Sequence, residues 1–169
     1  MPLIDPVLLK SRLGLLAGRF DVEALDVCDS TSSALSRRAE KGAPAGSVIV
    51  ADSQTAGRGR RGRDWLSSPA ASLTFSLLWR FDGPPARLSG LSLAIGVALS
   101  AGLERLGARG VCLKWPNDVL LCVGNDYAKL AGVLVELSSD RRGAQAVIGI
   151  GLNLLPPDEA LPQPAAGLS

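Results

Sequence analysis

The chain has 169 residues, of which 47% are hydrophobic and 20% charged, with a formal net charge of +2 and no histidine. This length and apolar content predict one compact domain with its own core, and they exclude an intrinsically disordered chain. The absence of histidine excludes Ser-His-Asp and Cys-His catalysis and every histidine-ligated metal site.

The first half of the chain predicts helices and strands in alternation. Asp5 caps a helix that has Pro6 at its first position and extends to about residue 16. A second helix is predicted over 34–39, between several capping side chains and Lys41-Gly42. The predicted strands of this half are 21–28, 46–51 and 71–79.

The second half begins with the longest helix candidate, 86–106, which is apolar over most of its surface and is therefore expected to be buried. Consecutive strands follow and read as hairpins, because Gly124-Asn125-Asp126 and the polar segment 138–143 have the composition of turns. The predicted strands are 111–115, 119–123, 129–137 and 144–152. Strands outnumber helices, which predicts the α+β class with a mixed sheet packed against helices.

The cysteines and the apolar stretches bear on location. Cys28, Cys112 and Cys122 are an odd number without paired spacing, which favours buried core thiols in a reducing compartment. No basic segment followed by an apolar block opens the chain, so no signal peptide is expected. The longest apolar stretch, 88–103, is shorter than the roughly 20 residues that a membrane span needs. We therefore expect a cytoplasmic protein.

Arginines and glycines are concentrated directly after the strand predicted at 46–51. The run Gly57-Arg58-Gly59-Arg60-Arg61-Gly62-Arg63 holds four arginines and three glycines. Arginine recognises phosphate or carboxylate with paired hydrogen bonds, and glycine lets the backbone approach an anion closely. The loop predicts a site for an anionic small molecule. A solvated basic loop, or a contact with nucleic acid, is the alternative.

Three further clusters carry polar groups into apolar surroundings. Lys114-Trp115-Pro116-Asn117-Asp118 places a cation, an amide and a carboxylate around a proline that bends or ends a strand. Lys129 enters an apolar strand, and Gly149 and Gly151 lie in another. The alternatives are lysines with exposed ammonium groups, glycines packed against a helix and an aspartate that caps a turn. Together the clusters supply what is needed to hold a polyphosphate with magnesium.

Five motifs in this order resemble the catalytic domain of bacterial biotin protein ligases. They are Asp29-Ser30-Thr31, Gln54 to Arg63, Lys114 to Asp118, Lys129-Leu130-Ala131-Gly132 and Gly149-Ile150-Gly151-Leu152-Asn153. The resemblance implies the α+β fold of the biotin/lipoate protein ligase domain, which is like that of class II synthetases. It implies a catalytic domain over residues 1–153 and a proline-rich tail, or a truncated continuation, over 154–169.

The resemblance also implies a two-step reaction with ATP and biotin as substrates. The biotin carboxylate attacks the α-phosphate of ATP to give biotinyl-5′-adenylate and pyrophosphate, and a lysine of a carboxylase carrier domain then attacks the mixed anhydride. Catalytic roles are implied for Arg60, Lys114, Lys129 and Asp118, and Mg²⁺ ligation for Asp118 and Asn117. Substrate contacts are implied for Ser30, Thr31, Ser32, Gln54, Gly57, Arg58, Gly59, Arg60, Asn117, Lys129, Gly132, Gly151 and Asn153.

Individual positions match individual roles in the family. Lys129 matches the lysine that contacts the biotin carboxylate and the α-phosphate, and Arg58 and Arg60 match positions that line the adenylate and order the loop over it. Ser30, Thr31 and Gln54 match positions that hydrogen-bond biotin. Ser32 stands where the family commonly has asparagine, so one hydrogen bond to biotin is expected to differ. The rest of the pocket is expected to be apolar, from residues 130–134 and the facing strand.

Other features separate this chain from the wider family. No winged helix-turn-helix precedes the motifs, so DNA binding is not expected, and the chain ends soon after Asn153. A membrane partner is not expected, and a homodimer through an exposed strand is an open expectation. The alternative functions are a lipoate or octanoate ligase or transferase, a nucleic-acid-binding module built on 58–63, and a non-catalytic domain that binds biotin without turning it over.

Overall fold

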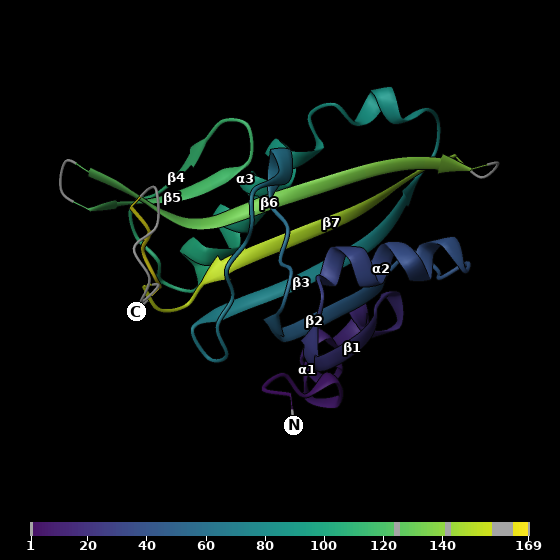
Figure 1. Cartoon of the computed structure of the whole chain (residues 1–169), viewed down its shortest axis with the longest axis horizontal. Helices are drawn as coiled ribbons and strands as arrows, with labels where there is room; N and C mark the ends of the chain where they lie inside the picture. Colours follow the sequence, from purple (N-terminus) through teal and green to yellow (C-terminus); the bar gives the residue numbers. More distant parts are fainter. Residues whose placement is uncertain (1, 124–125, 141–142, 157–163, 169) are drawn as a thin grey trace.

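A seven-stranded mixed sheet forms the centre of the described structure (Figure 1). The computed structural model describes residues 2–123, 126–140, 143–156 and 164–168. Within them the strand order is β1-β2-β3-β7-β6-β5-β4, in which β1 and β2 are parallel and the other neighbours are antiparallel. The mixed sheet and the α+β class predicted from the sequence are confirmed.

The elements follow the sequence predictions closely. The strands are β1 Asp21–Cys28, β2 Ser47–Gln54, β3 Ser72–Phe81, β4 Val111–Lys114, β5 Asp118–Val123, β6 Asp126–Asp140 and β7 Gly143–Asn153. The helices are α1 Pro6–Leu13, α2 Thr31–Glu40 and α3 Leu91–Arg105, with 3₁₀ turns at Gly14–Arg19, Arg60–Gly62 and Pro85–Leu88. β6 continues to Asp140, where a turn from residue 138 was predicted. Residues 124–125 and 141–142 of the predicted turns lie outside the described residues.

The first helix begins where the sequence predicts it. The Asp5 carboxylate accepts hydrogen bonds from the backbone N–H groups of Val7 and Leu8 at 2.8 and 3.3 Å, which satisfies two donors of the first turn. The α-helix ends at Leu13, earlier than predicted, because Gly14 takes a positive φ of 55° and a 3₁₀ turn follows.

Helices α2 and α3 cover opposite faces of the sheet. Leu35 of α2 packs in a core cluster with Leu78 and Val147, whereas Ile95 of α3 packs against Ile148. Val147 and Ile148 are neighbours in β7, and successive side chains of a strand point to opposite faces. Figure 1 shows α2 in front of the sheet and α3 behind it. The loop that follows β2 lies on the face of α2.

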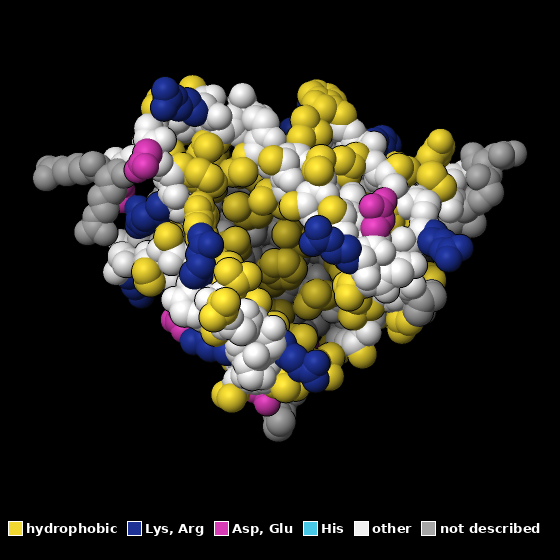
Figure 2. All heavy atoms as spheres, turned by 180° about the vertical axis from the view of Figure 1, so that it is seen from behind, with side chains coloured by type: hydrophobic (Ala, Val, Ile, Leu, Met, Phe, Trp, Pro, Cys, Tyr) yellow, Lys and Arg dark blue, Asp and Glu magenta, His cyan; other side chains and the backbone are white. Residues whose placement is uncertain are grey.

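Helix α3 is far more exposed than its composition predicts. Only Gly96 and Leu103 are buried, while Leu93 and Val97 are exposed. The prediction of a buried helix is wrong because α3 packs on the sheet with one side only, and no described element covers the other. Figure 2, which shows the face opposite to that of Figure 1, has hydrophobic side chains gathered around a central hollow.

The helical stretch Pro85–Arg105 is 21 residues long and apolar enough to cross a membrane by length and composition, the one such stretch in the described residues. The sequence expectation that no stretch reaches this length is corrected, because the 3₁₀ turn Pro85–Leu88 adds to the helix. Core helices of globular domains pass the same test, and Leu99 and Leu103 pack in a core cluster with the sheet residue Val119.

The described part of the predicted tail runs beside β6. The Lys129 N–H donates to the Pro164 carbonyl at 2.8 Å, and the Ala166 N–H donates to the Lys129 carbonyl at 3.0 Å. The same Lys129 carbonyl accepts a bond from the Asn153 side-chain amide at 3.2 Å. Residues 157–163 and 169 of the tail lie outside the described residues, and the domain boundary at Asn153 stays a prediction.

Candidate functional site

The loop after β2 folds into a small hairpin of its own. Its arms are joined by hydrogen bonds from the Trp65 N–H to the Gly57 carbonyl at 2.9 Å and from the Gly59 N–H to the Arg63 carbonyl at 2.7 Å. The tip is a 3₁₀ turn in which Arg61 has a φ of 58°. Gly57 is required by packing, because a Cβ there would lie 2.1 Å from the Trp65 carbonyl oxygen. The loop backbone that carries the arginines is therefore held in one conformation by hydrogen bonds and packing.

A neutral polar cluster lies where the start of α2 meets the sheet. Ser30, Thr31 and Ser32 are all buried. The Thr31 N–H donates to Gln54 Oε1 at 2.8 Å, and the Thr31 hydroxyl lies 2.8 Å from Ser76 Oγ, which is itself 2.9 Å from Ser32 Oγ. Ser76 of β3 is fully buried. The cluster offers hydroxyl and amide groups without charge, which suits a neutral polar ligand.

Trp65 lies over two glycines on the same face of the sheet. A Cβ at Gly151 would lie 2.2 Å from the Trp65 ring, and one at Gly132 would lie 3.2 Å from it. The indole N–H is buried and has no hydrogen-bond partner among the described residues. The Lys129 ammonium lies 5.5 Å from the centre of the indole ring, within cation–π range. The two glycines are therefore needed because the indole fills the space of their side chains.

A bulge in β6 decides which way Lys129 points. The register between β5 and β6 shifts at Val119/Leu120, so that Leu130 is an extra residue of β6. Leu130 and Ala131 both belong to the core cluster on the face of α3. Strict alternation from Gly132 would put Lys129 on that face too, but the bulge turns it to the face of Gly132. The expectation that residues 130–134 line the pocket is thus wrong for Leu130, Ala131 and Val133, because all three pack in core clusters with residues of α3 on the other face.

On that face the Lys129 ammonium forms an ion pair with Asp118 at 2.9 Å, and both side chains are about four-fifths buried, with 19% and 17% exposed. Asp118 is the first residue of β5 and lies opposite Gly132 in the ladder. A partly buried ion pair of this kind holds the lysine side chain in one position. The structure therefore brings together two of the predicted catalytic residues.

Arg58 and Arg60, the two loop arginines that match positions lining the adenylate in the family, contact other elements of the fold. Arg58 makes a two-pronged ion pair with the Glu136 carboxylate of β6, with N–O distances of 2.5 and 3.2 Å, and a hydrogen bond to Ser33 Oγ of α2 at 3.2 Å. Arg60 donates to Asn117 Oδ1 at 3.0 Å. The loop is therefore fastened to α2, β6 and the turn between β4 and β5.

The turn between β4 and β5 is fixed by β6. Asn117 donates from its side-chain amide to the Val133 carbonyl at 3.0 Å, and its own carbonyl accepts from the Val133 N–H at 2.9 Å. Lys114 pairs with Asp118 in the ladder. Its side chain is exposed and has no ion pair among the described residues. The structure thus places Lys114 next to Asp118 in the sheet, but it shows no contact between the Lys114 ammonium and the Asp118 carboxylate.

The donors proposed for magnesium are suitable in kind. Asp118 offers a carboxylate and Asn117 an amide oxygen, which are ligands that Mg²⁺ accepts. Each oxygen faces a cation, Lys129 and Arg60 respectively. No group of three or more acidic or cysteine side chains that could hold a metal is found among the described residues. An ion here would therefore depend mainly on phosphate oxygens of a bound nucleotide, as is usual for Mg²⁺.

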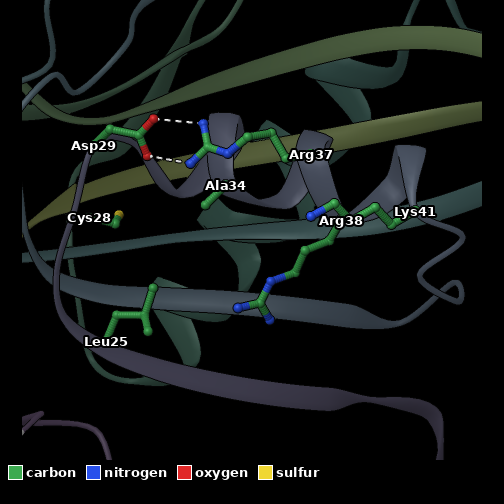
Figure 3. A pocket seen from close by; sticks show the side chains of 7 residues that line it. All are labelled: Leu25, Cys28, Asp29, Ala34, Arg37, Arg38 and Lys41. Atoms are coloured by element: carbon green, nitrogen blue, oxygen red, sulfur yellow. Dashed lines mark hydrogen bonds and ion pairs between the residues drawn. The ribbon is translucent and has the colours of Figure 1, made fainter.

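A separate surface pocket of about 550 Å³ lies between β1 and α2 (Figure 3). In it Asp29 faces Arg37, which donates two hydrogen bonds at 2.7 and 2.9 Å. These bonds lower the pKa of Asp29 to about 2. Arg38 is paired with Glu23 of β1. Two of its three cations are thus already neutralised, and the pocket lies apart from Lys129 and Trp65. This pocket therefore lacks the combination of neutral polar groups and cations that lines the face of Gly132 and Gly151.

Comparison with known proteins agrees with the geometry. The sequence model of the biotin/lipoate A/B protein ligase family matches residues 24–153. This chain belongs to that family. The bifunctional ligase/repressor BirA of Escherichia coli is 44% identical over 146 residues, which are 86% of this chain and 44% of that protein. The biotin--[acetyl-CoA-carboxylase] ligase of Mycobacterium tuberculosis is 36% identical over 99% of this chain and 62% of its own length.

Solved structures of the family share the fold. The biotin protein ligase from Aquifex aeolicus in complex with biotin and ATP is 34% identical, with a TM-score of 0.67 over 88% of this chain and 59% of that one. The biotin acetyl coenzyme A carboxylase synthetase from Helicobacter pylori gives the same TM-score at 32% identity, over 83% and 64%. The chain therefore spans less than two thirds of the length of each of these four family members.

Three residues contribute to the site although the sequence motifs did not single them out as site residues. Trp65 covers the glycines, Ser76 joins the polar cluster and Glu136 holds Arg58. A signal existed for Glu136, which is the one acidic residue of the apolar strand 129–137, whereas Ser76 is one of three hydroxyl residues in 71–79 and does not stand out there. Their partners could not be read from the sequence, because those contacts span 45 and 78 residues.

Proposed function

We propose that this chain is an ATP-dependent biotin ligase, which forms biotinyl-5′-adenylate and passes biotin to a lysine of a carboxylase carrier domain. The observation that supports this most directly is the juxtaposition of a neutral polar cluster with three cations on one glycine-lined face. Thr31 and Gln54 belong to the polar cluster, and Arg58, Arg60 and Lys129 supply the charge. Biotin has matching parts, because it carries a neutral ureido ring at one end and an anionic carboxylate at the other.

In the first step a carboxylate oxygen of biotin attacks the α-phosphorus of ATP, and the bond to the bridging oxygen breaks to release pyrophosphate. Two anions must meet, so cations have to neutralise both reactants and the charge that develops on the phosphorus oxygens. Lys129 is held on this face by its ion pair with Asp118. Arg60 reaches the same region from the loop through Asn117. Their ammonium and guanidinium groups would exchange these partners for phosphate and carboxylate oxygens.

Asp118 and Asn117 would hold a magnesium ion together with the nucleotide phosphates, and the ion would neutralise phosphate charge. Lys114, at the end of β4, would contribute a further cation near the nucleotide. Ser30, Ser32, Gly57, Gly59, Gly132, Gly151 and Asn153 complete the proposed substrate-binding set. Of these, Gly132 and Gly151 admit the Trp65 indole, which would exclude water from the adenylate.

In the second step the carrier lysine, as a neutral amine, attacks the carbonyl carbon of the mixed anhydride and AMP leaves. The two hydrogen bonds that Arg58 donates to Glu136 would position Arg58, and with it the loop that would cover the adenylate. Glu136 is proposed as a positioning residue and not as a catalytic one.

We also propose that the protein is cytoplasmic, that it has no DNA or membrane partner, and that it forms a homodimer.

The decisive experiment is incubation of the chain with biotin, magnesium and α-labelled ATP, with lipoate as the control acid. Labelled biotinyl-5′-adenylate from biotin alone is the expected result. Product from lipoate instead would replace biotin as the substrate. Absence of any adenylate, combined with calorimetric binding of biotin, would contradict ligase activity and leave a biotin-binding domain.

A further inference from the structure

Two thiols lie next to each other on the hairpin formed by β4 and β5. Cys112 Sγ and Cys122 Sγ are 3.5 Å apart, and both cysteines are free. The strand register explains the contact. Cys112 lies opposite Leu120 in the ladder, and Cys122 is two residues further along β5. Alternate residues of a strand share a face, so the two cysteines are diagonal neighbours on one side of the hairpin.

The two thiols differ in their surroundings. Cys122 is exposed, whereas Cys112 is partly buried. Burial, followed by the hydrogen bond with Cys122, raises the pKa of the Cys112 thiol. An oxidant in solution therefore meets Cys122 first, and Cys112 stands behind it as the group that can react next. The prediction from the sequence that all three cysteines are core residues is wrong for Cys122, because β4 and β5 form the edge of the sheet.

We propose that Cys112 and Cys122 are a modification site, an oxidisable dithiol that hydrogen peroxide converts to a disulfide. The Cys122 thiolate attacks one peroxide oxygen, the O–O bond breaks, and hydroxide leaves with a sulfenic acid on Cys122. The Cys112 thiolate then attacks this sulfur, the S–O bond breaks, and a second hydroxide leaves. Both hydroxides take up the protons that the thiols lost, so two thiols and one peroxide give one disulfide and two waters.

The geometry favours a disulfide between Cys112 and Cys122 over a disulfide with Cys28 and over a metal site. The sulfurs must approach from 3.5 Å to about 2.05 Å, a small movement for side chains on an edge hairpin. Cys28 cannot compete, because it lies in β1 at the opposite edge of the sheet. A structural metal site would need further ligands, and no group of three metal-binding side chains occurs among the described residues.

The disulfide would close a loop that contains Lys114 and Asp118. Both residues share the face of the hairpin with the cysteines, since they lie at even spacings from them along β4 and β5. Oxidation would therefore restrain the hairpin that presents these two groups. This consequence for adenylate formation rests on the proposed function, whereas the dithiol itself does not.

The test is peptide mapping of the whole chain after exposure to hydrogen peroxide, with free thiols alkylated before digestion under non-reducing conditions. Trypsin cleaves after Lys114 and so separates Cys112 from Cys122. The expected product is a disulfide-linked pair of the peptides 110–114 and 115–129 that separates on reduction. Cys28→Ser is the matched control and should give the same linked pair.

Single variants identify the order of the two steps. With Cys112→Ser, the Cys122 sulfenic acid should persist and be trapped by dimedone. With Cys122→Ser, Cys112 should remain a free thiol over the same exposure. The proposal is overturned if both peptides are recovered fully alkylated after peroxide, if Cys122 proceeds to sulfinic acid in the unaltered chain without cross-linking, or if the disulfide joins two chains. None of these outcomes depends on ligase activity.

Discussion

Replacing Gly151 with alanine tests whether Trp65 closes over the sheet as the structure shows. A Cβ at this position would lie 2.2, 2.3 and 2.6 Å from three atoms of the indole ring. Contacts between carbon atoms are comfortable only near 3.5–4.0 Å, so the indole would have to move by roughly 1 Å or more. Overpacking of this kind costs about 1–3 kcal/mol. We therefore expect Gly151→Ala to lower the free energy of unfolding by about that amount.

Two further glycines calibrate the result. At Gly132 the added Cβ would lie 3.2 Å from the ring, so Gly132→Ala should cost less than Gly151→Ala. At Gly102, inside α3, nothing lies within 4 Å. Gly102→Ala should therefore stabilise the chain by about 0.5–1 kcal/mol through helix propensity alone. The added Cβ at Gly132 would also lie 3.3 Å from Lys129 Cε, whereas the three nearest atoms at Gly151 all belong to the indole. The three variants therefore form a series in which the expected cost falls from Gly151 to Gly132 and becomes a gain at Gly102.

The assay is urea unfolding followed by circular dichroism, together with the tryptophan emission of the folded chain and its affinity for biotin. Gly151→Ala should shift the emission, because the buried indole N–H gains access to water, and should weaken biotin binding. A Gly151→Ala chain with unchanged stability and unchanged emission would refute the placement of Trp65 over β7.

Three other predictions concern charged groups. Arg60→Ala should lower the rate of adenylate formation by about 100-fold or more, since the variant lacks the cation that we propose faces the transition state; a near-normal rate in the labelled-ATP assay would remove Arg60 from the site. Lys129→Ala should have a similar effect and also weaken biotin binding measured by calorimetry, and turnover and affinity that both stay unchanged would exclude the proposed role. Asp29→Asn should destabilise the fold slightly at neutral pH. Because Arg37 lowers the pKa of the folded carboxyl to about 2, the carboxylate stabilises the fold above about pH 4 and this stabilisation is lost as the pH falls toward 2. The difference in urea midpoint between the Asp29→Asn chain and the unaltered chain should therefore disappear over that interval, and a difference that is constant with pH would contradict the ion pair as its source.

Much of the fold followed from local patterns in the sequence. Strands were predicted because alternation and β-branched residues are local signals, and the hairpins of the second half followed from turn residues between them. Helix α3 shows the limit of such reasoning. Its composition is that of a buried helix, but exposure depends on which elements pack against it, and one side of α3 has no described partner.

The sequence by itself determined the motifs, their order and the chemistry that they can supply: arginines and lysines for anions, glycines for close approach, and small neutral side chains for a polar ligand. The tertiary structure decided which of them meet. One extra residue in β6 turns Lys129 toward Asp118, because a bulge reverses the alternation of faces. Ser76 and Glu136 join the site through contacts between residues far apart in the chain. Local propensity carries no information about such contacts, since they exist only once the sheet has formed.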